Sequence, residues 1–170
     1  MISPFCVAVV KEFDGFFPHV YLDPVGKRTI GYGHLMLPHE TMTILNEDEA
    51  DALLRADLRV ASGDVEMTVA TLVLAQHELD ALTSFVFNLG VGNLRSSTLL
   101  RVLRNGDRRG AGAEFLRWVW ATKPNGDKVK LPGLVKRRHA ESVWFLGASE
   151  QTVLFIARGK MMGDSVRRPA

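Results

Sequence analysis

In this 170-residue chain, the residues before Pro38 carry signals for one helix and a small sheet, whereas those after it carry signals for helices. This change limits which folds the chain can adopt. Ser3 followed by Pro4 is a good helix start, because serine can cap the first amides and proline suits the first turn. We therefore expect a helix from about Pro4 to Phe13 that stops near Gly15. The next run, HVYLDPVGKRTIGYGH, is rich in β-branched and aromatic residues and is interrupted by turn residues. It predicts a small antiparallel sheet with tight turns.

The second part of the chain carries helix signals. Asn46 and Glu49 form a capping box, Ser96 and Ser97 can cap another helix, and Asp107 can start a further one. Apolar residues at helical spacing follow these starts, and glycines follow several of the expected ends. Helices are expected within residues 49–61, 75–90, 98–106, 108–121 and 132–147.

These patterns predict an α+β fold that is mostly helical. We expect one domain over residues 1–158, in which an N-terminal helix and β lobe (1–45) precede a helical lobe (46–158). A basic tail (159–170) follows. With 46% apolar and 24% charged residues, the composition is that of a globular protein, and a chain of this length buries about 70% of its unfolded surface.

Composition also limits which disulfides, metal sites and membrane segments the chain can contain. The single cysteine, Cys6, cannot form an internal disulfide, and its most common role is core packing. The five histidines are dispersed, so neither a metal site nor a cofactor is predicted. The N-terminal apolar run is too short for a signal peptide or a membrane anchor, and we expect no stable membrane insertion.

Basic residues are concentrated late in the chain, although the net charge is only +2. They can form a solvated face, or they can attract an anionic polymer such as a bacterial wall or a nucleic acid. No aromatic interleaving or nucleic-acid motif accompanies them, so nucleic acid is not an expected partner. The residues concerned are Lys128, Lys130, Lys136, Arg137, Arg138, Arg158, Lys160, Arg167 and Arg168.

Three carboxylates, Glu12, Asp14 and Asp23, lie close together in the sequence, at an expected helix end and in an expected hairpin. Two carboxylates on different elements suit glycoside hydrolysis, in which one protonates the leaving oxygen and the other stabilises charge, activates water or attacks carbon. Surface solvation is the more common explanation for such charges. The residues around these carboxylates favour the catalytic explanation.

One spacing pattern resembles the active-site signature of the phage-type lysozymes, the endolysin muramidases. In it, eight residues separate Asp14 from Asp23, five residues separate Asp23 from Thr29, and IGYGH follows directly. The resemblance continues in the family's order through ALTSFVFNLGVGNLRSSTLL (81–100), RWVW (117–120) and LPGLVKRRHAE (131–141), and covers roughly residues 7–145. It implies a lysozyme-like fold with the active-site cleft between the two lobes.

The resemblance implies that Asp23 is the second catalytic carboxylate and that Thr29 positions the attacking water or assists the displacement. The family has a glutamate where this chain has Asp14, so the general-acid role falls on a side chain one methylene shorter. Glu12 does not substitute, because two residues along a helix correspond to a rotation of about 200°. We interpret Glu12 as a surface charge.

Other positions follow from the same comparison. Gly31 and Gly33 let the backbone approach the cleft, and His34 is expected to tie the two lobes together. The remaining matches fall where the family contacts saccharide or lines the cleft, although packing or helix capping is an equal alternative for each of them. These residues are Phe87, Asn88 and Ser97.

The resemblance implies a monomeric muramidase that hydrolyses the β-1,4 bond between N-acetylmuramic acid and N-acetylglucosamine in bacterial peptidoglycan. Asp14 is expected to weaken it, because its shorter side chain reaches less far and its ordinary pKa is lower than that of glutamate. As a phage product it is expected in the host cytoplasm, with a holin giving access to the periplasmic wall. The alternative is a lysozyme-fold module that binds peptidoglycan or a protein with little cleavage.

Overall fold

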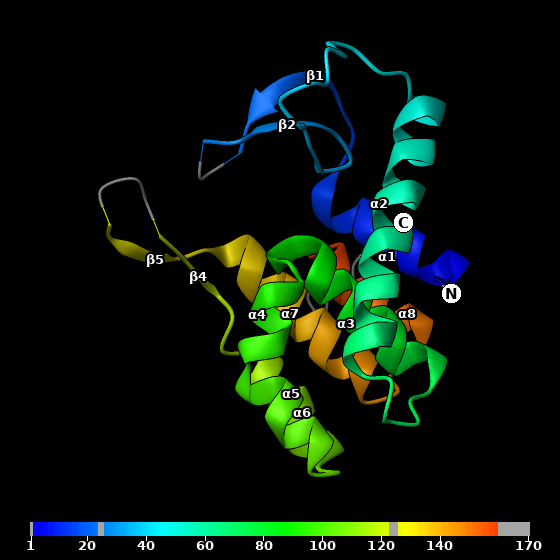
Figure 1. Cartoon of the computed structure of the whole chain (residues 1–170), viewed down its shortest axis with the longest axis vertical. Coiled ribbons are helices and arrows are strands. Elements are labelled where there is room, and N and C mark those ends of the chain that lie inside the picture. The colour runs from blue at the N-terminus through cyan, green and yellow to red at the C-terminus, as the bar shows by residue number, and fades with distance from the viewer. Residues whose placement is uncertain (1, 24–25, 123–125, 160–170) are drawn as a thin grey trace, which may run out of the picture.

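The computed structural model describes residues 2–23, 26–122 and 126–159, and it confirms the α+β, mostly helical prediction. Figure 1 shows a small sheet at one end of the molecule, a group of helices at the other, and one long helix, α2, running between them. The helices are α1 (Pro4–Asp14), α2 (Glu47–Thr68), α3 (Gln76–Leu89), α4 (Val91–Ser96), α5 (Thr98–Arg104), α6 (Arg108–Phe115), α7 (Pro132–Phe145) and α8 (Glu150–Ala157).

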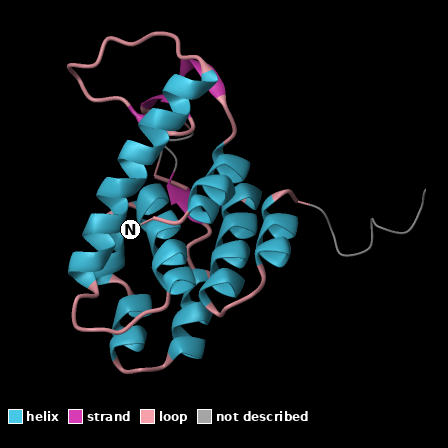
Figure 2. Cartoon of the chain, turned by 90° about the vertical axis from the view of Figure 1, so that its right-hand side faces the viewer, coloured by secondary structure: helices cyan, strands magenta, loops and turns pink. Residues whose placement is uncertain are grey.

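The first sheet consists of β1 (Phe17–Leu22), β2 (Arg28–Gly31) and β3 (His34–Leu35), with β2 in the middle. Both strand pairs are antiparallel, and Thr29 of β2 lies opposite Tyr21 on one side and Leu35 on the other. The sheet packs against α2, and Figure 2 shows it beyond one end of the helical group. Gly33, in the turn between β2 and β3, lies beside Asp14 at the end of α1.

Most of the expected helix starts are correct. The Ser3 side chain accepts the Cys6 amide of α1, and Asn46 and Glu49 form the capping box of α2. Ser97, rather than Ser96, caps α5, and the Asp107 side chain accepts the Gly110 amide of α6. Three helical features were not predicted: α4, α8 and the extension of α2 to Thr68.

The helix expected over 108–121 is wrong in its second half. It ends at Phe115, and residues Trp120–Thr122 form strand β4, which pairs antiparallel with β5 (Lys128–Lys130). The segment is rich in aromatic and β-branched residues, which favour strands once a partner is available. The partner strand, only three residues long, was not predicted. Residues 160–170 of the expected basic tail lie outside the described residues.

Helix α3 lies at the centre of the helical group, between α2 and α7. Its Phe85 is fully buried and contacts the rings of Phe115 and Trp118 edge-on, with centroids 5.5 and 5.3 Å away. Edge-to-face contacts of this kind add to the stabilisation from buried area. The core therefore holds α3 firmly, and with it the residues at its C-terminal end that face the sheet.

Candidate active site

A cavity of about 320 Å³ lies between the sheet and the C-terminal end of α3. It brings together six of the residues singled out in the sequence, from α1, the β1–β2 hairpin, the β2–β3 turn and α3. Gly31, His34 and Ser97 are not among its lining residues. The lining consists of Asp14, Tyr21, Asp23, Lys27, Thr29, Gly33, Leu35, Phe87 and Asn88.

Asp14 is the last residue of α1, and Gly15 ends the helix with a positive φ of 66°. The carboxylate is held by Arg137 of α7, whose Nη1 donates to both oxygens at 3.1 and 3.0 Å. The Asp14 side chain is 21% exposed, whereas that of Arg137 is 4% exposed. The Asp14 carboxylate is therefore hydrogen-bonded to Arg137 on its buried side and borders the cavity on its other side.

Burial raises the pKa of Asp14 above its ordinary value, while the charge and hydrogen bonds of Arg137 oppose this rise. Burial acts in this direction because a low-dielectric environment disfavours the charged carboxylate. A raised pKa is what a general acid needs, since the group must hold its proton at working pH before donating it.

Two basic residues need a corrected interpretation. We expected Arg137 and Arg138 to belong to a solvated or polymer-binding face, yet they are only 3% and 0% exposed. Both are ion-paired to the buried carboxylate of Glu141. The sequence contained a signal for these ion pairs, because arginines three and four residues before a glutamate lie on the same face of a helix as that glutamate.

Asp23 and Thr29 are placed by the β1–β2 hairpin. The Asp23 side chain accepts the Lys27 amide at 2.8 Å, and its backbone pairs with Lys27 as well. Thr29, 5% exposed, donates its hydroxyl to the Lys27 carbonyl at 3.2 Å. An aspartate that accepts an amide a few residues ahead stabilises a tight turn, so the hairpin fixes both side chains relative to each other.

Tyr21 and Lys27 also line the cavity and were not predicted as site residues. Burial raises the pKa of Tyr21, and the negative charges of Asp14 and Asp23 raise it further. Tyr21 therefore keeps its proton, and it lines the same cavity as the two carboxylates. Tyr21 stands two residues before Asp23, which directly follows β1, and this spacing was the signal that could have indicated the position.

The two glycines of the GYGH run have positive φ, 66° for Gly31 and 87° for Gly33. A Cβ on Gly33 would lie 3.4 Å from Asp14 Cγ, and a Cβ on Gly31 would lie 3.2 Å from that of Ala50. Gly33 thus brings the β2–β3 turn directly against the Asp14 side chain. Any other residue would add backbone strain there and narrow the space beside Asp14.

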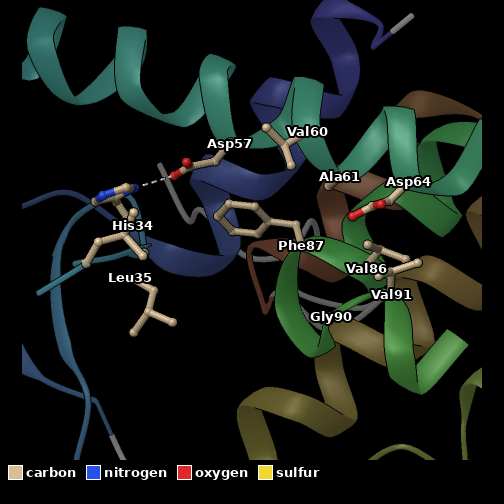
Figure 3. A pocket seen from close by; sticks show the side chains of 12 residues that line it. His34, Leu35, Asp57, Val60, Ala61, Asp64, Val86, Phe87, Gly90 and Val91 are labelled. Carbon is tan, nitrogen blue, oxygen red and sulfur yellow. Dashed lines mark hydrogen bonds and ion pairs between the residues drawn. The ribbon is translucent and has the colours of Figure 1, made fainter.

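A shallower groove of about 290 Å³ continues from the cavity, with which it shares Gly33, Leu35 and Phe87. Figure 3 shows the Phe87 ring between the sheet side of this groove and the side formed by α2 and α4. The lining is mostly apolar, with carboxylates from Asp57 and Asp64. Together the two hollows form a continuous cleft between the sheet and the helices.

His34 lies in this groove rather than beside Asp14. Its Nδ1 is 2.7 Å from Asp57 Oδ2 on α2, and its Nε2 is 3.1 Å from a Glu40 oxygen (Figure 3 shows the Asp57 contact). The hydrogen bond to Asp57 raises the pKa of His34, Glu40 adds to this effect, and burial opposes it. His34 therefore connects β3 to α2.

Of the remaining residues singled out in the sequence, some line the cavity and others make structural contacts elsewhere. Phe87 and Asn88 line the cavity, and within the described residues Asn88 Oδ1 is buried without a hydrogen-bond partner. Ser97 instead accepts the Leu100 amide at 3.0 Å and donates to Leu94 at 2.7 Å, so its hydroxyl is used in capping. Glu12 accepts two hydrogen bonds from Arg158 on the surface.

The described residues contain no group of three or more histidine, cysteine, aspartate or glutamate side chains able to hold a metal ion. Among these same residues, no helix combines the length and the apolar character needed to cross a membrane. The polar residues that line the cavity are Asp14, Tyr21, Asp23, Lys27, Thr29 and Asn88.

The phage lysozyme family matches residues 11–141. The endolysin of Acyrthosiphon pisum secondary endosymbiont phage 1 is 37% identical over 149 residues, which are 86% of this chain and 99% of that protein. The endolysin of Bacillus phage B103 is 37% identical over 89% of this chain, which spans only 56% of that relative. The SAR-endolysin of bacteriophage PS119 is 38% identical over 71% of this chain and 69% of that protein.

Among solved structures, the muramidase domain of SpmX from Asticaccaulis excentricus matches with a TM-score of 0.77 and 33% identity, over 87% of this chain and 99% of that one. The family match spans both cavity walls, from Lys11, before Asp14, to Glu141, behind Arg137. Cavity geometry, sequence and fold therefore agree, and the chain belongs to the phage lysozyme family of enzymes.

Proposed function

We propose that the chain is a monomeric endolysin that hydrolyses the β-1,4 bond between N-acetylmuramic acid and N-acetylglucosamine in bacterial peptidoglycan. The observation that carries this proposal is the cavity that holds Asp14, Asp23 and Thr29 together. Burial raises the pKa of the Asp14 carboxyl. A protonated carboxyl beside a second carboxylate is the arrangement that glycoside hydrolysis requires.

In this mechanism Asp14 donates its proton to the leaving glycosidic oxygen, and Arg137 then stabilises the carboxylate that forms. Asp23 is the partner carboxylate that faces the developing positive charge on the sugar and accepts the proton that the attacking water loses. Thr29, fixed by Lys27, accepts a hydrogen bond from the attacking water. Asn88 also lines the cavity and would contact the saccharide there.

We also propose that the enzyme is weakened by Asp14. An aspartate reaches roughly 1.5 Å less far than a glutamate, and a misplacement of about 1 Å can cost on the order of a hundredfold in rate. The two hydrogen bonds from Arg137 hold the carboxylate back against α7. Both features lengthen the distance over which the proton must be delivered.

The proposal is tested by turbidity assays on purified peptidoglycan, in which the protein is compared with Asp14→Asn and Glu12→Gln. Asp14→Asn is expected to abolish the measurable lysis, because the amide has no proton to donate to the leaving oxygen. Glu12→Gln is expected to leave it unchanged, since Glu12 faces Arg158 and does not line the cavity. Full activity of Asp14→Asn together with loss in Glu12→Gln would reverse the assignment.

The proposed route to the wall is release of a host-cytoplasmic enzyme through a holin. In a Gram-negative host, expression of the chain alone is then expected to leave the cells intact until the inner membrane is permeabilised, for instance with chloroform. Rapid lysis without permeabilisation would instead indicate export of the kind that the name of the PS119 relative describes. An Asp14→Asn culture serves as the control for lysis caused by expression itself.

A further inference from the structure

Four charged side chains meet behind the cavity. Asp14 comes from the end of α1, and Arg137, Arg138 and Glu141 come from one face of α7. Arg138 and Glu141 are fully buried, and Arg137 is 3% exposed. Burying this many charges is expensive unless each is paired and hydrogen-bonded, so the arrangement requires an explanation beyond packing.

Glu141 is the centre of this cluster. Ser84 of α3 donates its hydroxyl to Oε1 at 2.7 Å, and Arg137 Nε donates to the same oxygen at 3.2 Å. Arg138 reaches Oε1 with Nη2 at 2.8 Å and lies 2.7 Å from Oε2 through Nε. One carboxylate thus serves as the shared counter-charge of two guanidinium groups.

The contacts of Arg137 leave its guanidinium in one orientation. Nε faces Glu141, Nη1 faces both Asp14 oxygens, and Nη2 donates to the backbone oxygen and the hydroxyl of Ser84, both at 3.4 Å. The rings of Phe13 and Phe87 lie 5.0 and 5.9 Å from its centre. Because the guanidinium is planar, fixing Nε at Glu141 aims Nη1 at Asp14.

We propose that Glu141 is a positioning residue for the general acid: it aligns Arg137 on Asp14 and takes up part of the arginine charge, so that Asp14 can still hold a proton. This inference rests on the proposed function, because it assigns Asp14 the acid role. Glu141 does not line the cavity. It therefore acts only through Arg137 and through its own charge.

The signs of the interactions agree with this role. The charge of Glu141 raises the pKa of Asp14, whereas the charges of Arg137 and Arg138 lower it. Without Glu141, Asp14 would be the sole carboxylate of the cluster facing two guanidinium groups, and it would lose its proton more readily.

The cavity side of Asp14 carries three further ionisable residues, Tyr21, Asp23 and Lys27. Behind Glu141 lie Cys6 of α1 and Asp80 of α3. Burial raises the pKa of the Cys6 thiol, so this thiol stays neutral, and Asp80 accepts hydrogen bonds from Ser3 and Gln76. Glu141 is therefore the carboxylate that is paired directly with Arg137 and Arg138.

The test compares Glu141→Gln with Arg138→Gln in the full chain. Glutamine keeps the shape and an acceptor for Ser84 and Arg137, but it removes the negative charge. Glu141→Gln is expected to lower the pKa of the Asp14 carboxyl, followed by its ¹³C resonance during a pH titration, and to move the alkaline limb of the pH–activity profile to lower pH. Arg138→Gln is expected to move both in the opposite direction.

A shift of about one pKa unit would change the activity on the alkaline limb roughly tenfold. The matched control is Glu78→Gln, which neutralises another buried glutamate that pairs with an arginine, Arg108 at 2.7 Å, away from the cavity. It is expected to lower stability without moving the profile. Circular dichroism identifies any variant that does not fold. If one of Glu141→Gln and Arg138→Gln does not fold, the Asp14 titration in the other variant tests the inference.

An unchanged Asp14 titration in folded Glu141→Gln, or a shift of the same sign in Arg138→Gln, would overturn the inference. The titration does not depend on activity. A protein without measurable lysis but with the expected opposite shifts would therefore contradict the proposed function while supporting the positioning role of Glu141.

Discussion

Replacing Asp14 with glutamate is expected to raise the rate of peptidoglycan lysis by on the order of a hundredfold. The added methylene moves the carboxyl from the end of α1 into the cavity of about 320 Å³ that it borders. It also restores the residue type that the family resemblance implies at this position. Arg137 keeps its ion pair with Glu141, so the buried guanidinium is not left unpaired.

The measurement is the initial rate of turbidity loss at equal concentrations of folded protein. Glu12→Asp is a suitable control, because it changes a carboxylate by one methylene on the same helix but at the surface pair with Arg158. A rate for Asp14→Glu no higher than that of the parent would show that reach does not limit this enzyme. Lysis seen only with Asp14→Glu, while the parent still sediments with walls, would favour the binding-module alternative.

Replacing Asp23 with asparagine is expected to lower the rate by about 10²–10⁴, the range typical of a lost catalytic acid or base. The asparagine Oδ1 can still accept the Lys27 amide, so the hairpin turn is retained while the charge that faces the sugar is removed. The loss is best measured in the Asp14→Glu background, where the higher starting rate leaves room to see it.

Asp107→Asn is the matched control for this change. Asp107 also accepts a backbone amide through its side chain, that of Gly110 at 2.7 Å, but it begins α6 and does not line the cavity. Its neutralisation is expected to leave the rate unchanged. A drop of less than about threefold in a folded Asp23→Asn protein, well below the range for a catalytic group, would remove Asp23 from the proposed mechanism.

Local signals predicted much of the fold because they act within a few residues. The capping box of Asn46 and Glu49 and the Ser3–Pro4 start required no knowledge of the rest of the chain. The strand Trp120–Thr122 was missed because its aromatic and β-branched residues follow a helix directly and its pairing partner lies several residues ahead. Strand formation there depends on pairing rather than on local preference.

By itself, the sequence determined the mostly helical fold class, the turn that holds Asp23 beside Thr29, and the candidate acid Asp14. These depend on spacing and on contacts between near neighbours. Only the tertiary structure decided that Arg137 grips Asp14, from which it is separated by 123 positions in the chain. An arginine in a basic run looks like surface charge until packing buries it, because burial depends on which helices meet and not on the residues beside it.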